Sequence, residues 1–160
     1  MNNLDTEIER KYLVKYIPEN YDGCYEVFAG YFKNSDGLSI RVVATEDKIK
    51  NTKSGRITFK SPGTLSRKEY EFRIDYQKAI DMLENLTCGK IIKTRYDYKM
   101  SDYILELDQY HGDNDGLVVA EIELSSIDQK VNLHDCIGEE VTEDQKYYNA
   151  NLAFHPFCDW

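Results

Sequence analysis

Long apolar stretches are missing from this sequence, and no run approaches the roughly 18 residues that a helix needs to cross a bilayer. The chain begins Met1-Asn2-Asn3-Leu4-Asp5, without the basic and then apolar segment of a secretory signal. These absences predict a cytoplasmic protein with no membrane partner. With 160 residues, 41% of them hydrophobic and 31% charged, the chain can bury a core of its own. We expect a single domain over residues 1–160.

Cysteine and histidine are too few and too scattered to build a metal knuckle or a redox centre. Cys24, Cys88, Cys136 and Cys158 form no CxxC pair, which argues against a zinc site or a redox dithiol and predicts reduced thiols. The three histidines show no metal-ligand spacing either. A metal site built on histidine is therefore not expected.

Positive charge is also in deficit. Lys and Arg together number 20 against 29 Asp and Glu, for a formal net charge of -9. Binding to a nucleic-acid backbone requires a basic surface, so a nucleic-acid partner is not expected. If the chain binds a polyanion, its positive site must be local.

Alternation of character at every second residue dominates the sequence and is typical of β-strands. Short turn motifs at 34–37, 61–63 and 112–116 separate the segments and favour antiparallel neighbours. Helical spacing appears in Tyr76 to Leu86, which Asp75 could cap, and in a shorter stretch from Leu133 to Ile137. The predicted strands are 6–14, 25–33, 38–44, 56–60, 67–75, 90–99, 103–110 and 117–125. Eight strands in a mainly β (α+β) chain indicate a barrel or a sandwich.

Charged side chains occupy one face of seven of these strands. Residues two apart share a face, so Glu7, Glu9 and Lys11 point one way while Ile8 and Tyr12 point the other. For a single strand, a solvated face explains such a pattern. Its repetition favours a shared charged cavity, because two Glu-x-Glu pairs place like charges side by side. The other charged faces carry Ser39 and Arg41; Thr58 and Lys60; Arg67, Glu69, Glu71 and Arg73; Lys93 and Arg95; Glu106 and Asp108; Glu121 and Glu123.

Crowded carboxylates of this kind require cations to compensate them. Hard oxygen ligands at this spacing suit Mg²⁺ or Mn²⁺, and the remaining lysines and arginines then require a multiply charged anion. A polyphosphate meets both demands, because the basic side chains neutralise its oxygens while a metal bridges them to the carboxylates. A barrel with a charged interior must turn its apolar faces outward, where helices or a second copy in a homodimer could cover them.

The chain also resembles the CYTH superfamily, the triphosphate tunnel metalloenzymes, through the N-terminal motif Glu7-x-Glu9-x-Lys11. The similarity continues nearly to the C-terminus. Further matching motifs are Gly30-Tyr31, Ser39-x-Arg41, Thr58-Phe59-Lys60, Leu65-Ser66-Arg67-x-Glu69-Tyr70-Glu71, Lys93-Thr94-Arg95-Tyr96, Leu105-Glu106-Leu107-Asp108, Ala120-Glu121-Ile122-Glu123 and the segment from Gly138 to Asn149. The resemblance implies an eight-stranded antiparallel closed barrel, the triphosphate tunnel, that acts on triphosphates with Mg²⁺ or Mn²⁺.

Roles for individual residues follow from the resemblance alone. It implies that Glu7, Glu9 and Glu123 hold a first metal ion. It also implies a second group that holds another metal or orients the attacking water, and a third group that grips the phosphates. The second group is Glu71, Asp108 and Glu121; the third is Lys11, Arg41, Lys60, Lys93, Arg95 and Lys146. The family usually carries Arg-x-Arg where this chain has Ser39-Ile40-Arg41, so one phosphate contact is missing or made by a neighbour. Tyr31 matches a family position near the tunnel, and its role stays open.

The function expected on these grounds is metal-dependent hydrolysis of a triphosphate, with water attacking a terminal phosphorus. Inorganic tripolyphosphate is the first candidate substrate because it is compact, and a nucleoside triphosphate or thiamine triphosphate follows. Two alternatives stay open: an adenylate cyclase that makes cyclic AMP and pyrophosphate from ATP, and a non-catalytic polyphosphate- or nucleotide-binding module.

Overall fold

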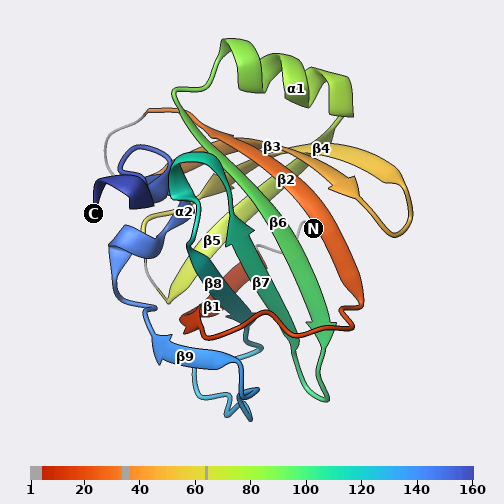
Figure 1. Ribbon diagram of the computed structural model, residues 1–160. Helices are drawn as coiled ribbons and strands as arrows, with labels where there is room; N and C mark the ends of the chain where they lie inside the picture. The colour runs from red at the N-terminus through yellow and green to blue at the C-terminus, as the bar shows by residue number, and fades with distance from the viewer. Residues whose placement is uncertain (1–4, 34–36, 64) are drawn as a thin grey trace.

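The computed structural model describes residues 5–33, 37–63 and 65–160, and most of them lie in β-strands (Figure 1). Each of the eight predicted strands is present, although several begin or end at other residues. The strands are β1 Asp5–Val14, β2 Gly23–Tyr31, β3 Ser39–Asp47, β4 Thr52–Lys60, β5 Ser66–Ile74, β6 Gly89–Lys99, β7 Ile104–Tyr110, β8 Val118–Glu123 and β9 Ile137–Glu140. The α-helices are α1 Tyr76–Asn85 and α2 Asn149–Leu152, and the 3-10 helices are η1 Gly112–Asn114, η2 Gln145–Tyr147 and η3 Phe157–Asp159.

The first eight strands close into an antiparallel barrel, as predicted. Their order is β5-β4-β3-β2-β6-β7-β8-β1, and β1 also pairs with β5, where Glu7 lies opposite Arg67. This last pairing removes both edges of the sheet and encloses the face that carries the charged side chains. The short strand β9 pairs with the end of β1 beyond this ring.

The hairpin between β3 and β4 is longer than the sequence pattern predicted. The strands extend to Asp47 and begin again at Thr52, because polar pairs continue the ladder past the apolar residues. The Asp47 carboxylate accepts hydrogen bonds from the backbone N–H groups of Ile49 and Lys50, at 3.0 and 2.8 Å. Asn51 completes the turn with a positive φ of 54°, a conformation that asparagine tolerates better than most residues.

Helix α1 covers the outer face of β3 and β4 (Figure 1). Its N-cap is Asp75, as expected, and the carboxylate accepts hydrogen bonds from the backbone N–H groups of Gln77 and Lys78. Ala79 and Leu83 are buried against Val42 and Ala44. Gly55 permits this close packing, because a Cβ atom there would lie 2.8 Å from the Cβ of Ala79.

Two further apolar clusters complete the core. One lies on the outward faces of β1, β6, β7 and β8, beneath β9 and the loop before it, and includes Leu105, Leu107 and Ile122. The other joins inward residues of β2 and β3, such as Val27 and Val43, to Leu152 of the C-terminal segment. The barrel interior therefore holds an apolar cluster as well as its charged residues.

One predicted helix is absent, and part of one predicted turn lies outside the described residues. Residues 133–137 form no helix: the chain turns at Asp135 and Cys136, and Ile137 begins β9 by pairing with Val14. Of the predicted turn at 34–37, residues 34–36 lie outside the described residues. Two outward aromatics of β5 stay largely exposed among the described residues of this single chain, with Tyr70 47% and Phe72 57% exposed, so cover by a second copy stays a prediction. Among the described helices, none has the length and apolar character needed to cross a membrane.

Candidate functional site

A cavity of about 340 Å³ occupies the barrel interior and collects the charged faces of the strands. Acidic and basic residues from β1, β3, β4, β5, β6, β7 and β8 line it together, as the alternation predicted. The charged lining residues are Glu7, Glu9, Lys11, Arg41, Arg56, Lys60, Arg67, Lys93, Arg95, Asp97, Glu106, Glu121 and Glu123. Isolated charges are costly inside a protein, so the partners of each group decide what the cavity can bind.

Lys11 stands at the junction of β1 and β8 and is almost completely buried. Its Nζ lies 3.1 Å from Oε1 of Glu9 and hydrogen-bonds Oε1 of Glu121. The strand register produces this contact, because Lys11 is directly opposite Glu121 in the β1–β8 ladder. Burial opposes the charge on Lys11, but Glu121 and Glu9 outweigh it and raise the pKa of the lysine.

The start of β1 meets β4 and β5 in a second set of ion pairs. Lys60 Nζ lies 2.6 Å from Glu7 Oε2 and 2.9 Å from Glu69 Oε2. Arg67 Nη2 lies 2.6 Å from Glu9 Oε1. Burial, together with repulsion from Glu9, raises the pKa of Glu7 despite its contact with Lys60. This corner would therefore be stabilised by additional positive charge.

A third set lies on β6 and β7. Asp108 is completely buried, and its carboxylate accepts hydrogen bonds from Lys93 Nζ and from Arg95 Nε at 2.7 Å. Arg95 also donates to Glu106 and, at 2.6 Å, to Glu121. Burial, and after it the charge of Arg95, lowers the pKa of Lys93 to about 8.

The arginines of β3 and β4 are placed differently from these cations. Arg41 Nη1 donates to the hydroxyl of Tyr31 at 3.5 Å, and its buried Nε has no hydrogen-bond partner among the described residues. The buried Nε of Arg56 also lacks a hydrogen bond, although it lies 3.3 Å from Glu71 Oε2. Unpartnered buried donors of this kind are suited to receiving an anion.

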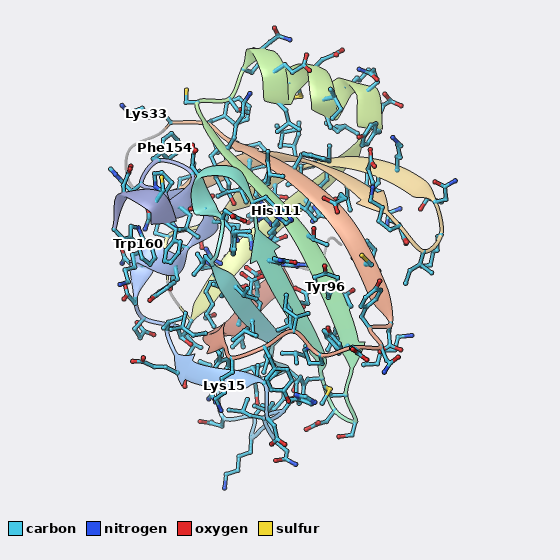
Figure 2. The ribbon with its side chains drawn as sticks, viewed as in Figure 1. Lys15, Lys33, Tyr96, His111, Phe154 and Trp160 are labelled. Atoms are coloured by element: carbon cyan, nitrogen blue, oxygen red, sulfur yellow. The ribbon has the colours of Figure 1, made fainter. Side chains whose placement is uncertain are left out.

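Not every residue with an expected role lines the cavity. Nine of the expected residues do so: Glu7, Glu9, Lys11, Arg41, Lys60, Lys93, Arg95, Glu121 and Glu123. Asp108 lies behind Lys93 and Arg95, and Glu71 is exposed beside Arg56. Lys146 lies 4.6 Å from the ring centroid of Trp160, which Figure 2 shows in the C-terminal segment at the left of the view.

Several lining residues received no role from the sequence, among them Arg67, Arg56 and Tyr148. Arg67 and Arg56 share the inward faces of their strands with residues that were singled out, so the two-residue spacing could have identified both. Tyr148 could not be found in this way. It comes from the C-terminal segment, and its ring centroid lies 5.7 Å from Lys11 Nζ and 5.6 Å from Arg67 Cζ.

The carboxylates suit a divalent metal by chemistry and by position. Glu9 and Glu123 are direct partners across β1 and β8, Glu7 adjoins them, and all three offer hard oxygen ligands. Within the described part of the chain, no three acidic, histidine or cysteine side chains already form a metal cluster. Lys60 and Arg67 hold Glu7 and Glu9 instead. The donor set therefore fits Mg²⁺ or Mn²⁺ if the ion takes over charge that these basic side chains now neutralise.

Comparisons with known proteins agree with this architecture. The family model of the CYTH domain matches residues 5–151. The inorganic triphosphatase of Acetivibrio thermocellus is 36% identical over 161 residues, which cover 94% of this chain and 95% of that protein. The inorganic triphosphatase of Nitrosomonas europaea is 38% identical over 155 residues, with 92% and 97% covered. A crystal structure of an inorganic triphosphatase superposes with a TM-score of 0.65 at 31% identity and covers 95% of this chain and 97% of that chain.

Proposed function

Because this chain belongs to the CYTH domain family, we propose that it hydrolyses a triphosphate, with inorganic tripolyphosphate as its first substrate. Water would attack a terminal phosphorus, and the bond from that phosphorus to the bridging oxygen would break to give orthophosphate and pyrophosphate. The inorganic triphosphatases that resemble the chain support this substrate, since both align over more than nine tenths of it.

The observation that carries the proposal is the mixed lining of the enclosed cavity. A site for an anion alone gains nothing from glutamates, and a site for a metal alone gains nothing from lysines and arginines. Here Glu9 and Glu121 lie in the same cavity as Lys93 and Arg95. A triphosphate that binds as a metal complex is a ligand that uses both kinds of group.

The chain's own residues would position and neutralise the substrate. Lys11, Lys60, Lys93, Arg41 and Arg95 would bind phosphate oxygens, and the charge that develops on those oxygens in the transition state would strengthen the contacts. Glu121 or Glu71 would orient the attacking water in line with the bond that breaks. Asp108, which is fully buried, would hold Lys93 and Arg95 in place.

Membership of the family implies a divalent metal ion. We assign its first site to Glu7, Glu9 and Glu123. Of the two residues expected at a second site, Glu121 lines the cavity and could bind an ion, whereas Asp108 would have to exchange its contacts with Lys93 and Arg95 first. When bound, the ion would neutralise phosphate charge and polarise the phosphorus–oxygen bonds. The choice between Mg²⁺ and Mn²⁺, the cytoplasmic location and the possible homodimer stay predictions.

A product screen tests the proposal. Tripolyphosphate, ATP, GTP and thiamine triphosphate are each incubated with Mg²⁺ or Mn²⁺, released phosphate is measured, and products are separated by chromatography. We expect orthophosphate, fastest from tripolyphosphate, with none in EDTA. Cyclic AMP from ATP would establish a cyclase instead, and binding without turnover of any substrate would leave a binding module.

A further inference from the structure

We propose that Arg56 is a phosphate-binding residue and that Arg56 and Arg41 together form the subsite for one terminal phosphate group of the substrate. This inference rests on the proposed function and deepens it. It adds a residue that the sequence did not single out and places one end of the triphosphate against β3 and β4.

Charge compensation sets Arg56 and Arg41 apart from the other cations of the cavity. Lys60 and Arg67 each have a carboxylate oxygen at 2.6 Å, and Lys11 has one at 3.1 Å. Lys93 and Arg95 share the carboxylate of Asp108. For Arg56 the ion pair with Glu71 is 3.3 Å long, and both side chains are about a third or more exposed. Within the described part of the chain, its Nε forms no hydrogen bond. Arg41 has only a hydroxyl among the hydrogen bonds of the described residues.

The strand register aims the two guanidinium groups at a common region. Arg41 lies opposite Thr58, and Arg56 is two residues before Thr58 on β4. The two arginines are thus diagonal neighbours on the inward face, with Cα atoms on the order of 7 Å apart. Two planar guanidinium groups at this spacing can each donate two hydrogen bonds to one terminal phosphate, which carries three oxygens.

Local electrostatics favour an anion at this point. Burial, and after it the positive charge of Arg41, lowers the pKa of Arg56. Glu69 attracts both arginines and Glu71 attracts Arg56, but among the described residues neither guanidinium Nε forms a hydrogen bond with a carboxylate. The Oγ1 atoms of Thr45 and Thr58 are also buried on the same strands, without a hydrogen-bond partner in residues 5–33, 37–63 and 65–160. A phosphate dianion would neutralise the two arginines and could accept a hydrogen bond from a threonine hydroxyl.

The position of Ser39 strengthens the inference. The chain has serine where the resemblance leads us to expect a second phosphate-binding arginine, and Ser39 pairs with Lys60 in the β3–β4 ladder. Arg56 lies four residues before Lys60, or roughly 13 Å along the strand. Arg56 therefore does not replace the missing side chain in place. Compared with the pattern that the resemblance leads us to expect, one positive charge available to the substrate lies farther along the tunnel, nearer the hairpin of β3 and β4.

Variants of Arg56 test the proposal through both binding and turnover. Tripolyphosphate is titrated calorimetrically into metal-free protein in EDTA, and kcat and KM are measured with Mg²⁺. Loss of the charge-assisted hydrogen bonds in Arg56→Gln should weaken binding about 10- to 100-fold and raise KM, with the melting temperature nearly unchanged. Arg56→Lys keeps the charge but loses the planar fork, so its affinity should fall between the two.

Arg10→Gln is the matched control, because Arg10 donates to the carbonyl of Ile127 outside the cavity and its loss removes the same charge. If Arg10→Gln lowers the affinity for tripolyphosphate as much as Arg56→Gln does, the effect comes from net charge and the inference is wrong. Wild-type affinity in Arg56→Gln, or no binding by the wild type, would also overturn it. If Arg56→Gln does not fold, Arg56→Lys still tests the inference. Wild-type affinity in Arg56→Lys would contradict the two hydrogen bonds that we assign to the planar guanidinium group. Adding Ser39→Arg to Arg56→Gln should not restore the affinity for tripolyphosphate, because residues 39 and 56 lie at different positions along the tunnel. Full restoration would show that an arginine at either position binds the same phosphate group.

The same measurements separate this inference from the proposed function. If the wild type binds tripolyphosphate through Arg56 but releases no phosphate, the hydrolase fails and the subsite stands. If the wild type hydrolyses tripolyphosphate and Arg56→Gln has an unchanged KM, the subsite fails and the hydrolase stands.

Discussion

The two sides of the tunnel treat charge in opposite ways. Where β1, β6, β7 and β8 meet, each buried cation is held by carboxylates, as Lys11 is by Glu9 and Glu121. On β3 and β4, Arg41 and Arg56 leave buried donor atoms without hydrogen bonds. The cations of the first side, which we call the paired side, must exchange partners to bind an anion, while Arg41 and Arg56 can accept an anion through donor atoms that are free among the described residues.

Removing the cation at the centre of the paired side should have the largest effect. Lys11→Met would leave Glu9 and Glu121 buried with less compensation, and breaking a buried pair in this way costs about 3–5 kcal/mol. We expect the free energy of unfolding in urea to fall by that amount. Lys48→Met is the control, because Lys48 also pairs at 3.1 Å, with Glu46, but its side chain is 46% exposed. Similar losses in both variants would show that burial of the pair does not matter.

Replacing a carboxylate of the paired side should affect activity more than folding. Glu9→Gln removes a charged ligand from the assigned metal site but keeps the shape of the side chain. We expect phosphate release with Mg²⁺ or Mn²⁺ to fall at least ~100-fold, with the circular dichroism spectrum unchanged. Glu84→Gln, on the exposed face of α1, should retain full activity. Unchanged turnover in Glu9→Gln would remove that glutamate from the site.

An ion-pair cluster outside the cavity should show the smallest effect. Hydrogen bonds from Lys53, Tyr76 and Lys48 lower the pKa of Glu46 to about 2, from an ordinary value of 4.5. A depressed carboxyl pKa stabilises the fold above pH 4.5, and this contribution disappears as the pH falls through the folded-state pKa. Glu46→Gln should therefore cost about 1 kcal/mol or less at pH 7, and the difference should shrink toward zero as the pH falls through the folded-state pKa of about 2.

Urea unfolding of wild type and Glu46→Gln across this pH range measures the difference, and tripolyphosphate turnover at pH 7 should be the same in both. A stability difference that persists at acid pH would show that the pairing of the carboxylate is not its source. A loss of turnover would show that the separation between the external cluster and the tunnel is incomplete.

The sequence predicted the strands and their charged faces because alternation at every second residue reports directly on a half-buried sheet. It failed at Leu133 to Ile137, where a few apolar residues resemble a helical turn, because the pairing of Ile137 with Val14 joins segments 123 residues apart. Strand pairing over such a distance leaves no local periodicity to detect. The helix from Tyr76 was predictable because Asp75 and the apolar spacing lie within one segment.

By itself, the sequence determined that charged side chains share one face in each of seven strands, because residues two apart on a strand point the same way. The tertiary structure decided which of these charges neutralise each other. Closure of the barrel places Glu7 opposite Arg67 and Lys11 opposite Glu121, while it leaves Arg56 beside Arg41. Coulomb interactions depend on distances between strands, and the register of a closed sheet sets those distances.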